Sequence, residues 1–273
     1  MNINAFSLQG KTAWITGASY GIGFAIATAF AGCGAKIVFN DINQELVDKG
    51  LAAYKEAGVE AHGYVCDVTN EDAVQALVKK IEAEVAPIDI LVNNAGCAVS
   101  GAIWKLPKRD IDWITELNFL SHLYGMKIFL PQMIAQGTPC EIVNVESTAG
   151  LMTSGKATMY HATKAAGVAT SESVYIAMKE NNYPINVHCL VPAYVKTTIH
   201  LADLHRPERF AINDDPYYTS EEYKAKHPES ADRPKWSALD NRMLRCTVGN
   251  DVRDWKEALA CFFAHWDGEN GMK

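Results

Sequence analysis

The chain has 273 residues, 48% of them hydrophobic, and a formal net charge of −7 at pH 7. This length suits one large α/β domain with a substantial core, and the acidic balance without a dense Lys/Arg stripe argues against a nucleic-acid surface. No apolar run approaches the roughly 20 residues of a membrane span, and the N-terminal segment lacks the pattern of a secretory signal.

The seven cysteines stand singly along the chain, without a CxxC pair. This distribution is typical of reduced, buried thiols and not of a secreted disulfide framework, so we expect a cytoplasmic protein. The histidines show no HxxxH or HxH spacing, and we expect no metal site. His200, His205 and His227 are interpreted as surface residues.

From residue 12 onward, short β-branched runs alternate with longer amphipathic segments. The runs typical of buried strands are 12–16, 36–41, 63–67, 88–94, 140–146 and 185–192. The segments typical of helices are 21–33, 43–57, 70–85, 110–136 and 156–181. This alternation predicts an α/β fold of the Rossmann type, a doubly wound parallel sheet with helices on both faces.

The segment 197–240 interrupts this alternation with four prolines and several aromatic residues. A long irregular insertion in a compact domain is typically a functional lid, so we interpret it as a substrate lid, with a solvated loop as the alternative. Beyond it, 243–248 is predicted as a last strand and 252–266 as a closing helix. We expect a single domain over residues 1–273.

A glycine-rich turn follows the first predicted strand directly, in the sequence TGASYGIG at 16–23. Its glycines permit a tight turn and close approach of the backbone to a pyrophosphate, which the N-terminus of the next helix would bind. A purely structural turn is the alternative. The candidate cofactor-binding residues are Gly17, Ser19, Tyr20, Gly21, Ile22 and Gly23.

The second predicted strand ends at Asp41, eighteen residues after Gly23. A carboxylate there accepts hydrogen bonds from ribose hydroxyls and repels a 2′-phosphate, which favours NAD(H) over NADP(H). Lys36 and Lys49 are the nearby cations that argue the other way. Alternatively, Asp41 caps the helix that begins near Asn43.

Polar residues also end the third and fourth predicted strands. Asp67, followed by Val68, is placed to bind near the adenine, and the sequence NNAG ends the next strand. Asparagine side chains at a strand end can bond a neighbouring strand's backbone. Asn94, Ala95 and Gly96 are therefore candidates for the floor of the cofactor cleft.

Tyr160, Lys164 and Ser147 form an acid/base pattern. In a helix, residues four apart share a face, so the Lys164 ammonium can approach the Tyr160 phenol and lower its pKa toward the working range. Ser147 would add a neutral hydroxyl at the same place. A coincidental spacing is the alternative for this pattern taken alone.

These motifs, together with Asn118, Pro192 and Thr197, resemble in order and spacing the short-chain dehydrogenase/reductase family over about residues 8–200. The resemblance implies a catalytic set of Asn118, Ser147, Tyr160 and Lys164. Tyr160 would be the general acid or base, and Ser147 would bind the substrate oxygen. Lys164 would hold the nicotinamide ribose, and Asn118 would hold a relay water.

The resemblance further implies that Thr197 and the backbone of Val195 bind the carboxamide, close to Pro192. It also implies a homo-oligomer, a tetramer or a dimer, that pairs helices near 110–136 and 156–181. Two features depart from the family pattern: Ala193 replaces the usual glycine, and the chain lacks the common Asp-Gly-Gly ending.

The N-terminal third resembles gluconate 5-dehydrogenases, but the candidate substrate-pocket residues are large and apolar. They include Trp104, Met152 and Tyr194, beside Ser147 and Tyr160. A sugar acid would need Arg or Lys and several hydroxyl partners, of which these positions show few. We therefore expect a bulky apolar alcohol or ketone, such as a steroid or aryl compound, with a sugar acid as the alternative.

Two further alternatives remain open at this point. The same four side chains could serve a dehydratase, an epimerase or an enoyl reductase. A protein of another class, a non-catalytic NAD sensor or scaffold, would need none of them.

Overall fold

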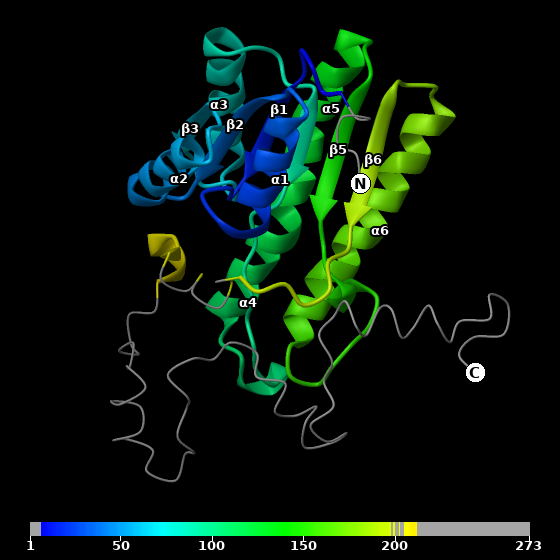
Figure 1. Cartoon of the computed structure of the whole chain (residues 1–273). Coiled ribbons are helices and arrows are strands. Elements are labelled where there is room, and N and C mark those ends of the chain that lie inside the picture. The colour runs from blue at the N-terminus through cyan, green and yellow to red at the C-terminus, as the bar shows by residue number, and fades with distance from the viewer. Residues whose placement is uncertain (1–6, 198, 200–201, 203–204, 212–273) are drawn as a thin grey trace, which may run out of the picture. The chain divides into compact units, whose positions relative to one another are not determined.

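Six parallel strands form the sheet in this computed structural model, which describes residues 7–197, 199, 202 and 205–211. Their order across the sheet is β3-β2-β1-β4-β5-β6 (Figure 1). The strands are β1 (Thr12–Thr16), β2 (Lys36–Asp41), β3 (Ala61–Val65), β4 (Ile90–Asn93), β5 (Cys140–Val145) and β6 (Ile185–Leu190). The predicted doubly wound parallel sheet is confirmed.

Helices cover both faces of this sheet and enclose two separate apolar clusters. On one face, α1 (Gly21–Gly32) and α2 (Gln44–Glu56) pack over β1 and β2 through residues such as Ala27 and Tyr54. On the other face lie α3 (Glu71–Glu84), α5 (Ser121–Gln136) and α6 (Thr158–Glu180). The two layers hold the sheet rigid, so that its carboxyl edge can position a site.

Several element boundaries follow directly from local chemistry. β1 and β2 match their predicted bounds, because each is a continuous apolar run buried on both faces. Asn43 and Asn70 accept hydrogen bonds from the backbone of Leu46 and Ala73, and so cap α2 and α3.

The third strand starts at Ala61, two residues earlier than predicted, and ends at Val65. It is an edge strand whose residues are only half-buried, so its apolar pattern is weak. Cys66 still donates a backbone hydrogen bond to Asp41, but Asp67 turns the chain by accepting from the backbone of Thr69.

The predicted helix 110–136 is in fact three segments. α4 (Lys108–Thr115) begins earlier than predicted, and a π-helical turn, η3 (Glu116–Leu120), separates it from α5. Short π segments inside helices are often found at functional sites. Here the π turn contains Asn118, which is completely buried.

The predicted strand 243–248, the predicted helix 252–266 and most of the predicted lid lie outside the described residues. All the described residues fall within one compact unit, Met1–Asn213. The expectation of a single domain over the whole chain stays a prediction. Within the part that the structure describes, no helix is long and apolar enough to cross a membrane.

Candidate active site

A cleft of about 1130 Å³, including space open to solvent, lies at the carboxyl edge of the sheet. β1 and β4 are neighbours at its centre, where the order of connections reverses. In doubly wound sheets this switch point is where ligands bind. The lining residues come from the ends of β1 to β5, from α6 and from the segment after β6. Figure 1 shows these strand ends converging toward α4 and the chain that follows β6.

The glycine-rich turn forms one wall of the cleft. Gly17 and Gly21 have φ angles of +60° and +66°, which L side chains rarely adopt. A Cβ on Gly17 would lie 3.0 Å from the Cα of Ala95. The Asn94 side chain donates to the carbonyl oxygens of Thr16 and Gly17 at 2.8 and 3.0 Å, so it ties β4 to this turn.

The turn also carries a buried donor without a partner. Among the described residues, the Ser19 hydroxyl has no hydrogen bond, although it lies next to the first turn of α1. A hydroxyl and free backbone N–H groups at a helix N-terminus fit a phosphate. Gly23 has a different function: a Cβ there would lie 2.5 Å from the Asn94 amide nitrogen, so Gly23 permits close packing.

Asp41 lies at the end of β2, buried, with its side chain lining the cleft. Its carboxylate accepts from the backbone of Ile42 at 2.9 Å and of Ser19 at 3.4 Å. It does not cap α2, because Asn43 does. Neither candidate cation lines the cleft: Lys49 pairs with Glu45 on the surface, and Lys36 donates to a carbonyl oxygen of Val85.

On the same side of the cleft, Asp67, Val68 and Thr69 follow β3, the strand next to β2. Arg209, from the segment after β6, donates to Asp67 at 3.3 Å and also to the Thr69 hydroxyl. The same guanidinium reaches Glu116 at 2.8 Å. His205, which we expected on the surface, is half-buried and lines the cleft.

β5 and α6 bring the predicted acid/base residues together. Ser147 follows β5 and caps the short helix η4 (Thr148–Gly150) by accepting from the backbone of Ala149. Tyr160 and Lys164 lie on one face of α6, and both line the cleft. The pKa of Tyr160 is raised, which corrects the expectation that Lys164 lowers it: burial raises it, Ser147 lowers it by a smaller amount, and the charge of Glu146 raises it further.

Lys164 is almost completely buried, and its ammonium faces the end of β5. It donates to the carbonyl oxygen of Val145 at 2.8 Å and lies 3.3 Å from a carboxylate oxygen of Glu146. Burial lowers the pKa of Lys164, and the Glu146 carboxylate partly offsets that effect.

The buried Asn118 binds the loop that follows β4. Its side chain accepts from the backbone N–H of Cys97 at 2.8 Å and donates to the carbonyl oxygen of the same residue at 2.9 Å. Both ends of the Asn118 amide are therefore engaged. The π turn places Asn118 where its side chain can bond the loop after β4 at Cys97, the residue that follows Gly96.

Sequence reasoning missed two site residues, Glu146 and His122. The Glu146 carboxylate is 3.0 Å from Nδ1 of His122, and both side chains are buried. Glu146 lines the cleft immediately before Ser147. A usable signal was present: His122 stands four residues after Asn118, and Glu146 is a charged residue that directly follows the buried end of a strand and precedes Ser147.

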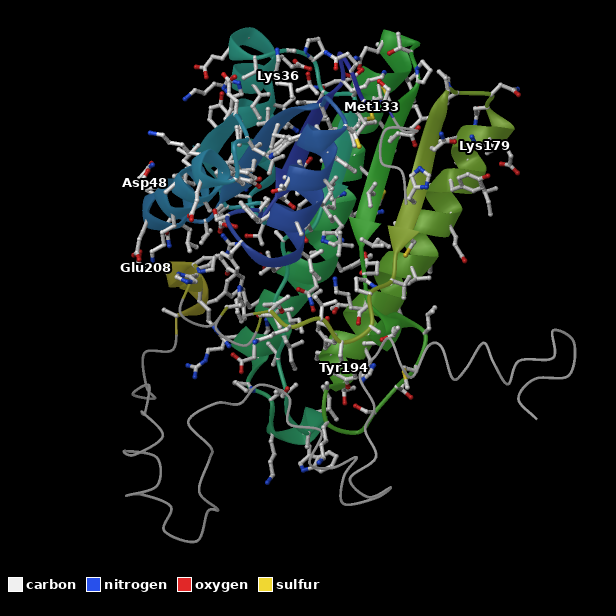
Figure 2. The ribbon with its side chains drawn as sticks, in the orientation of Figure 1. Lys36, Asp48, Met133, Lys179, Tyr194 and Glu208 are labelled. Carbon is white, nitrogen blue, oxygen red and sulfur yellow. The ribbon has the colours of Figure 1, made fainter. Side chains whose placement is uncertain are left out.

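Some predicted residues lie away from the described cleft lining. Pro192 ties the end of β6 to η4 by accepting from the backbone of Thr148. The side chains of Val195, Trp104, Met152 and Tyr194 are exposed. Figure 2 shows Tyr194 beyond the carboxyl edge of the sheet, on the side of α4 and α6. Thr197, in contrast, lines the cleft, and its Cγ2 would lie 3.9 Å from a Cβ placed on Gly21.

Within the described ranges, no group of three His, Cys, Asp or Glu side chains is arranged to hold a metal ion.

Comparison with known proteins assigns this chain to a family. The family model described as short chain dehydrogenase matches residues 11–207. The CLA biosynthesis dehydrogenase/reductase of Lactiplantibacillus plantarum is 38% identical over 213 residues, which is 78% of this chain and 74% of that protein. The chain belongs to the short-chain dehydrogenase/reductase family of oxidoreductases.

Other relatives have different named substrates. A 2-dehydro-3-deoxy-D-gluconate 5-dehydrogenase of Formosa agariphila is 31% identical and covers 72% of this chain and 74% of its own length. Epidermal retinol dehydrogenase 2 of Mus musculus is 32% identical, over 70% of this chain and 62% of its own.

Solved structures agree with the fold. A Burkholderia phymatum short-chain dehydrogenase/reductase in complex with NAD has a TM-score of 0.74 at 29% identity, covering 93% of this chain and 87% of its own. A Burkholderia cenocepacia gluconate 5-dehydrogenase in complex with NADP and tartrate has a TM-score of 0.66 at 29% identity, covering 77% and 81%.

Proposed function

We propose that this protein is an NAD(H)-dependent oxidoreductase that interconverts a secondary alcohol and its ketone. The observation that carries the proposal is the convergence of Tyr160 and Lys164 on a cleft at the sheet's switch point, with Ser147 close enough to Tyr160 to lower its pKa. An acid/base phenol, a hydroxyl and a buried ammonium are the groups that carbonyl reduction needs at one place.

Each of these side chains has a defined part in the reaction. Tyr160 donates its phenolic proton to the carbonyl oxygen during reduction and accepts a proton during alcohol oxidation. Ser147 donates a hydrogen bond to the same oxygen and stabilises the charge that develops there. Because its pKa is raised, Tyr160 is protonated at neutral pH, which suits reduction, while oxidation should accelerate at alkaline pH.

The cleft residues fit a nicotinamide dinucleotide. Ser19 and the N-terminus of α1 would hold the phosphates, and Asp41 the adenosine ribose. Asp67 and Val68 would contact the adenine, and Thr197 the carboxamide. When bound, such a cofactor supplies or accepts the hydride. The carboxylate of Asp41, with neither Lys36 nor Lys49 among the described lining residues, supports NAD(H) over NADP(H).

A bulky, largely apolar substrate such as a steroid or aryl compound is the favoured class. Beside Tyr160, the cleft is lined by Trp113 and Leu117, and further out by Ile199 and Ala202. Lys164 is the only lysine or arginine among the described residues that line the cleft. Its ammonium already interacts with the carbonyl oxygen of Val145 and with Glu146. A sugar acid, as named for the Formosa relative, is the alternative and would need a cation from elsewhere.

A non-catalytic NAD sensor or scaffold, the alternative from another class, would not need Ser147, Tyr160 and Lys164 at the cleft. A dehydratase, epimerase or enoyl reductase would use the same groups but would not yield a ketone from an alcohol.

We also propose that the protein is a cytoplasmic homo-oligomer. The exposed apolar side chains of Tyr175 and Ile176 on α6 suit a contact between subunits.

The test is a substrate screen with the full chain. Steroid, aryl and sugar-acid ketones are offered with NADH, and loss of its absorbance is followed; the set is repeated with NADPH. The proposal expects NADH oxidation with an apolar ketone and a matching alcohol product. Turnover of sugar acids alone would move the assignment to the alternative, and NADH binding without turnover of any compound would favour the sensor.

A further inference from the structure

A buried polar cluster lies directly behind the catalytic lysine and includes two residues that the reaction described above does not use. Glu146 follows β5 and is in contact with Lys164 of α6 and His122 of α5. All three side chains are at most 5% exposed. Three ionisable groups with so little access to water need hydrogen-bond and charge partners among themselves or in the backbone around them.

The position of Glu146 is built into the packing of α6. A Cβ on Gly167 would lie 2.2 Å from one carboxylate oxygen of Glu146, so the helix has a glycine where the carboxylate sits. That oxygen, Oε1, faces Nδ1 of His122 at 3.0 Å. The other, Oε2, lies 3.3 Å from Nζ of Lys164 and has no hydrogen-bond partner among the described residues.

The hydrogen-bond partners of His122 determine where its protons are. Nε2 lies 3.2 Å from the backbone carbonyl oxygen of Ala95, which can only accept, so Nε2 carries a hydrogen. A neutral imidazole then has a lone pair on Nδ1, and a carboxylate facing that lone pair would be repelled. One proton must therefore lie between Nδ1 of His122 and Oε1 of Glu146, whichever atom holds it.

We propose that Glu146 and His122 are positioning residues that share one proton behind Lys164, and that this proton keeps the positive charge of the lysine effective at Tyr160. With the shared proton, the pair is neutral and the cluster has the net charge of the ammonium, +1. Without the shared proton, the negative charge of the Glu146 carboxylate would cancel the positive charge of Lys164. The effect on Tyr160 rests on the proposed function, whereas the shared proton does not.

The electrostatics of the site agree with this arrangement. Burial alone would raise the pKa of Glu146, but the hydrogen bond and charge of His122, with Lys164, hold it below its usual value. The Glu146 carboxylate in turn raises the pKa of Tyr160. Among the described residues, the other titratable groups that act on Tyr160 or Lys164 include Cys97 after β4, Cys189 on β6 and Tyr194 beyond β6.

The test uses the full chain with His122→Asn, Glu146→Gln and the double variant. In His122→Asn the new amide cannot hold the proton, so the carboxylate should oppose Lys164 and the Tyr160 ionisation should move up by about one pH unit. In Glu146→Gln the new amide can donate a hydrogen bond to a neutral His122 imidazole. The positive charge of Lys164 then has no carboxylate beside it, so the ionisation of Tyr160 should not move to higher pH. The double variant restores the net charge of +1 and should return the ionisation toward the wild-type midpoint.

The main readout is the tyrosinate absorbance of each protein minus that of its Tyr160→Phe counterpart. It does not depend on turnover, and the pH profile of alcohol oxidation provides a second measurement. The matched control is His188→Asn, because His188 also pairs with a glutamate, Glu141 at 2.7 Å, but on the surface. This control should leave the midpoint unchanged.

A His122→Asn protein with an unchanged Tyr160 midpoint would overturn the proposal, because Glu146 would then have taken up the proton by itself. A double variant shifted as far as His122→Asn would also overturn it and indicate a purely structural role. If His122→Asn fails to fold, His122→Gln replaces it. In ¹⁵N-histidine spectra we expect hydrogen on Nε2 of His122; a signal showing a bare Nε2 would contradict the shared proton even in a protein with no enzymatic activity.

Discussion

Asn118 holds Cys97 by both of its backbone groups, with distances of 2.8 and 2.9 Å across 21 residues of sequence. The pair joins the π turn to the loop after β4, and so it fixes Gly96 and the floor of the cleft. This contact explains why Asn118 is completely buried: both polar ends of its side-chain amide bind the backbone of Cys97.

Replacing Asn118 by Leu should destabilise the protein by about 2–4 kcal/mol, because it removes both hydrogen bonds between the buried Asn118 amide and the backbone of Cys97. The free energy of unfolding in urea measures this. Asn181→Ala is the control: its side chain is exposed and bonds the carbonyl oxygen of Ala177, so the expected change is within about 0.5 kcal/mol. Equal losses for the two variants would show that the Cys97 contacts add nothing.

Alkaline pH should destabilise the fold through Cys66. Burial, with a smaller contribution from Asp67, raises the pKa of this thiol from 9.0 to about 12. Below pH 9 both folded and unfolded chains keep the proton, and the stabilisation is complete. Between about pH 9 and pH 12 only the unfolded chain loses it, so stability should fall by about 1.4 kcal/mol per pH unit from this residue.

Unfolding measured from pH 8 to pH 11 checks this contribution. Cys66→Ala should lose stability at neutral pH but show a shallower decline above pH 9. Val68→Ala, which removes volume from the same core cluster without removing a titratable group, should keep the wild-type slope. If the two variants have parallel pH curves, Cys66 does not titrate as stated.

Asp41 should set the choice between the two nicotinamide cofactors. Asp41→Ser removes the charge that repels a 2′-phosphate, so the ratio of kcat/KM for NADPH to that for NADH should rise roughly tenfold or more. Asp48→Ser serves as the control, since Asp48 lies on the outer side of α2 and bonds Gln44 (Figure 2). An unchanged ratio for Asp41→Ser would refute the preference for NAD(H).

Much of the fold could be predicted because its signals are local. The buried runs at 12–16 and 36–41 and the glycine turn between β1 and α1 each depend on neighbouring residues, and the structure places them as expected. The edge strand β3 was misplaced because half-buried residues give a weak pattern.

The features that sequence reasoning missed depend on contacts between distant segments. The π turn contains Asn118, which pairs with Cys97 across 21 residues of sequence, and periodicity cannot reveal such a contact. Likewise, Glu146 and His122 acquire their meaning only when β5 and α5 pack together. The roles given to Trp104 and Met152 stay predictions, because both side chains are exposed and the chain after residue 211 lies outside the described residues.

The most direct test of the central claim compares wild type with Tyr160→Phe in reduction of an apolar ketone by NADH. Because the phenol is the proton donor, we predict that turnover falls by at least about 100-fold while the Kd for NADH, measured by fluorescence, stays nearly unchanged. Tyr64→Phe, which removes a phenol that bonds Glu84 at the surface, should behave as wild type. A Tyr160→Phe protein that retains wild-type turnover would contradict the assigned acid/base role.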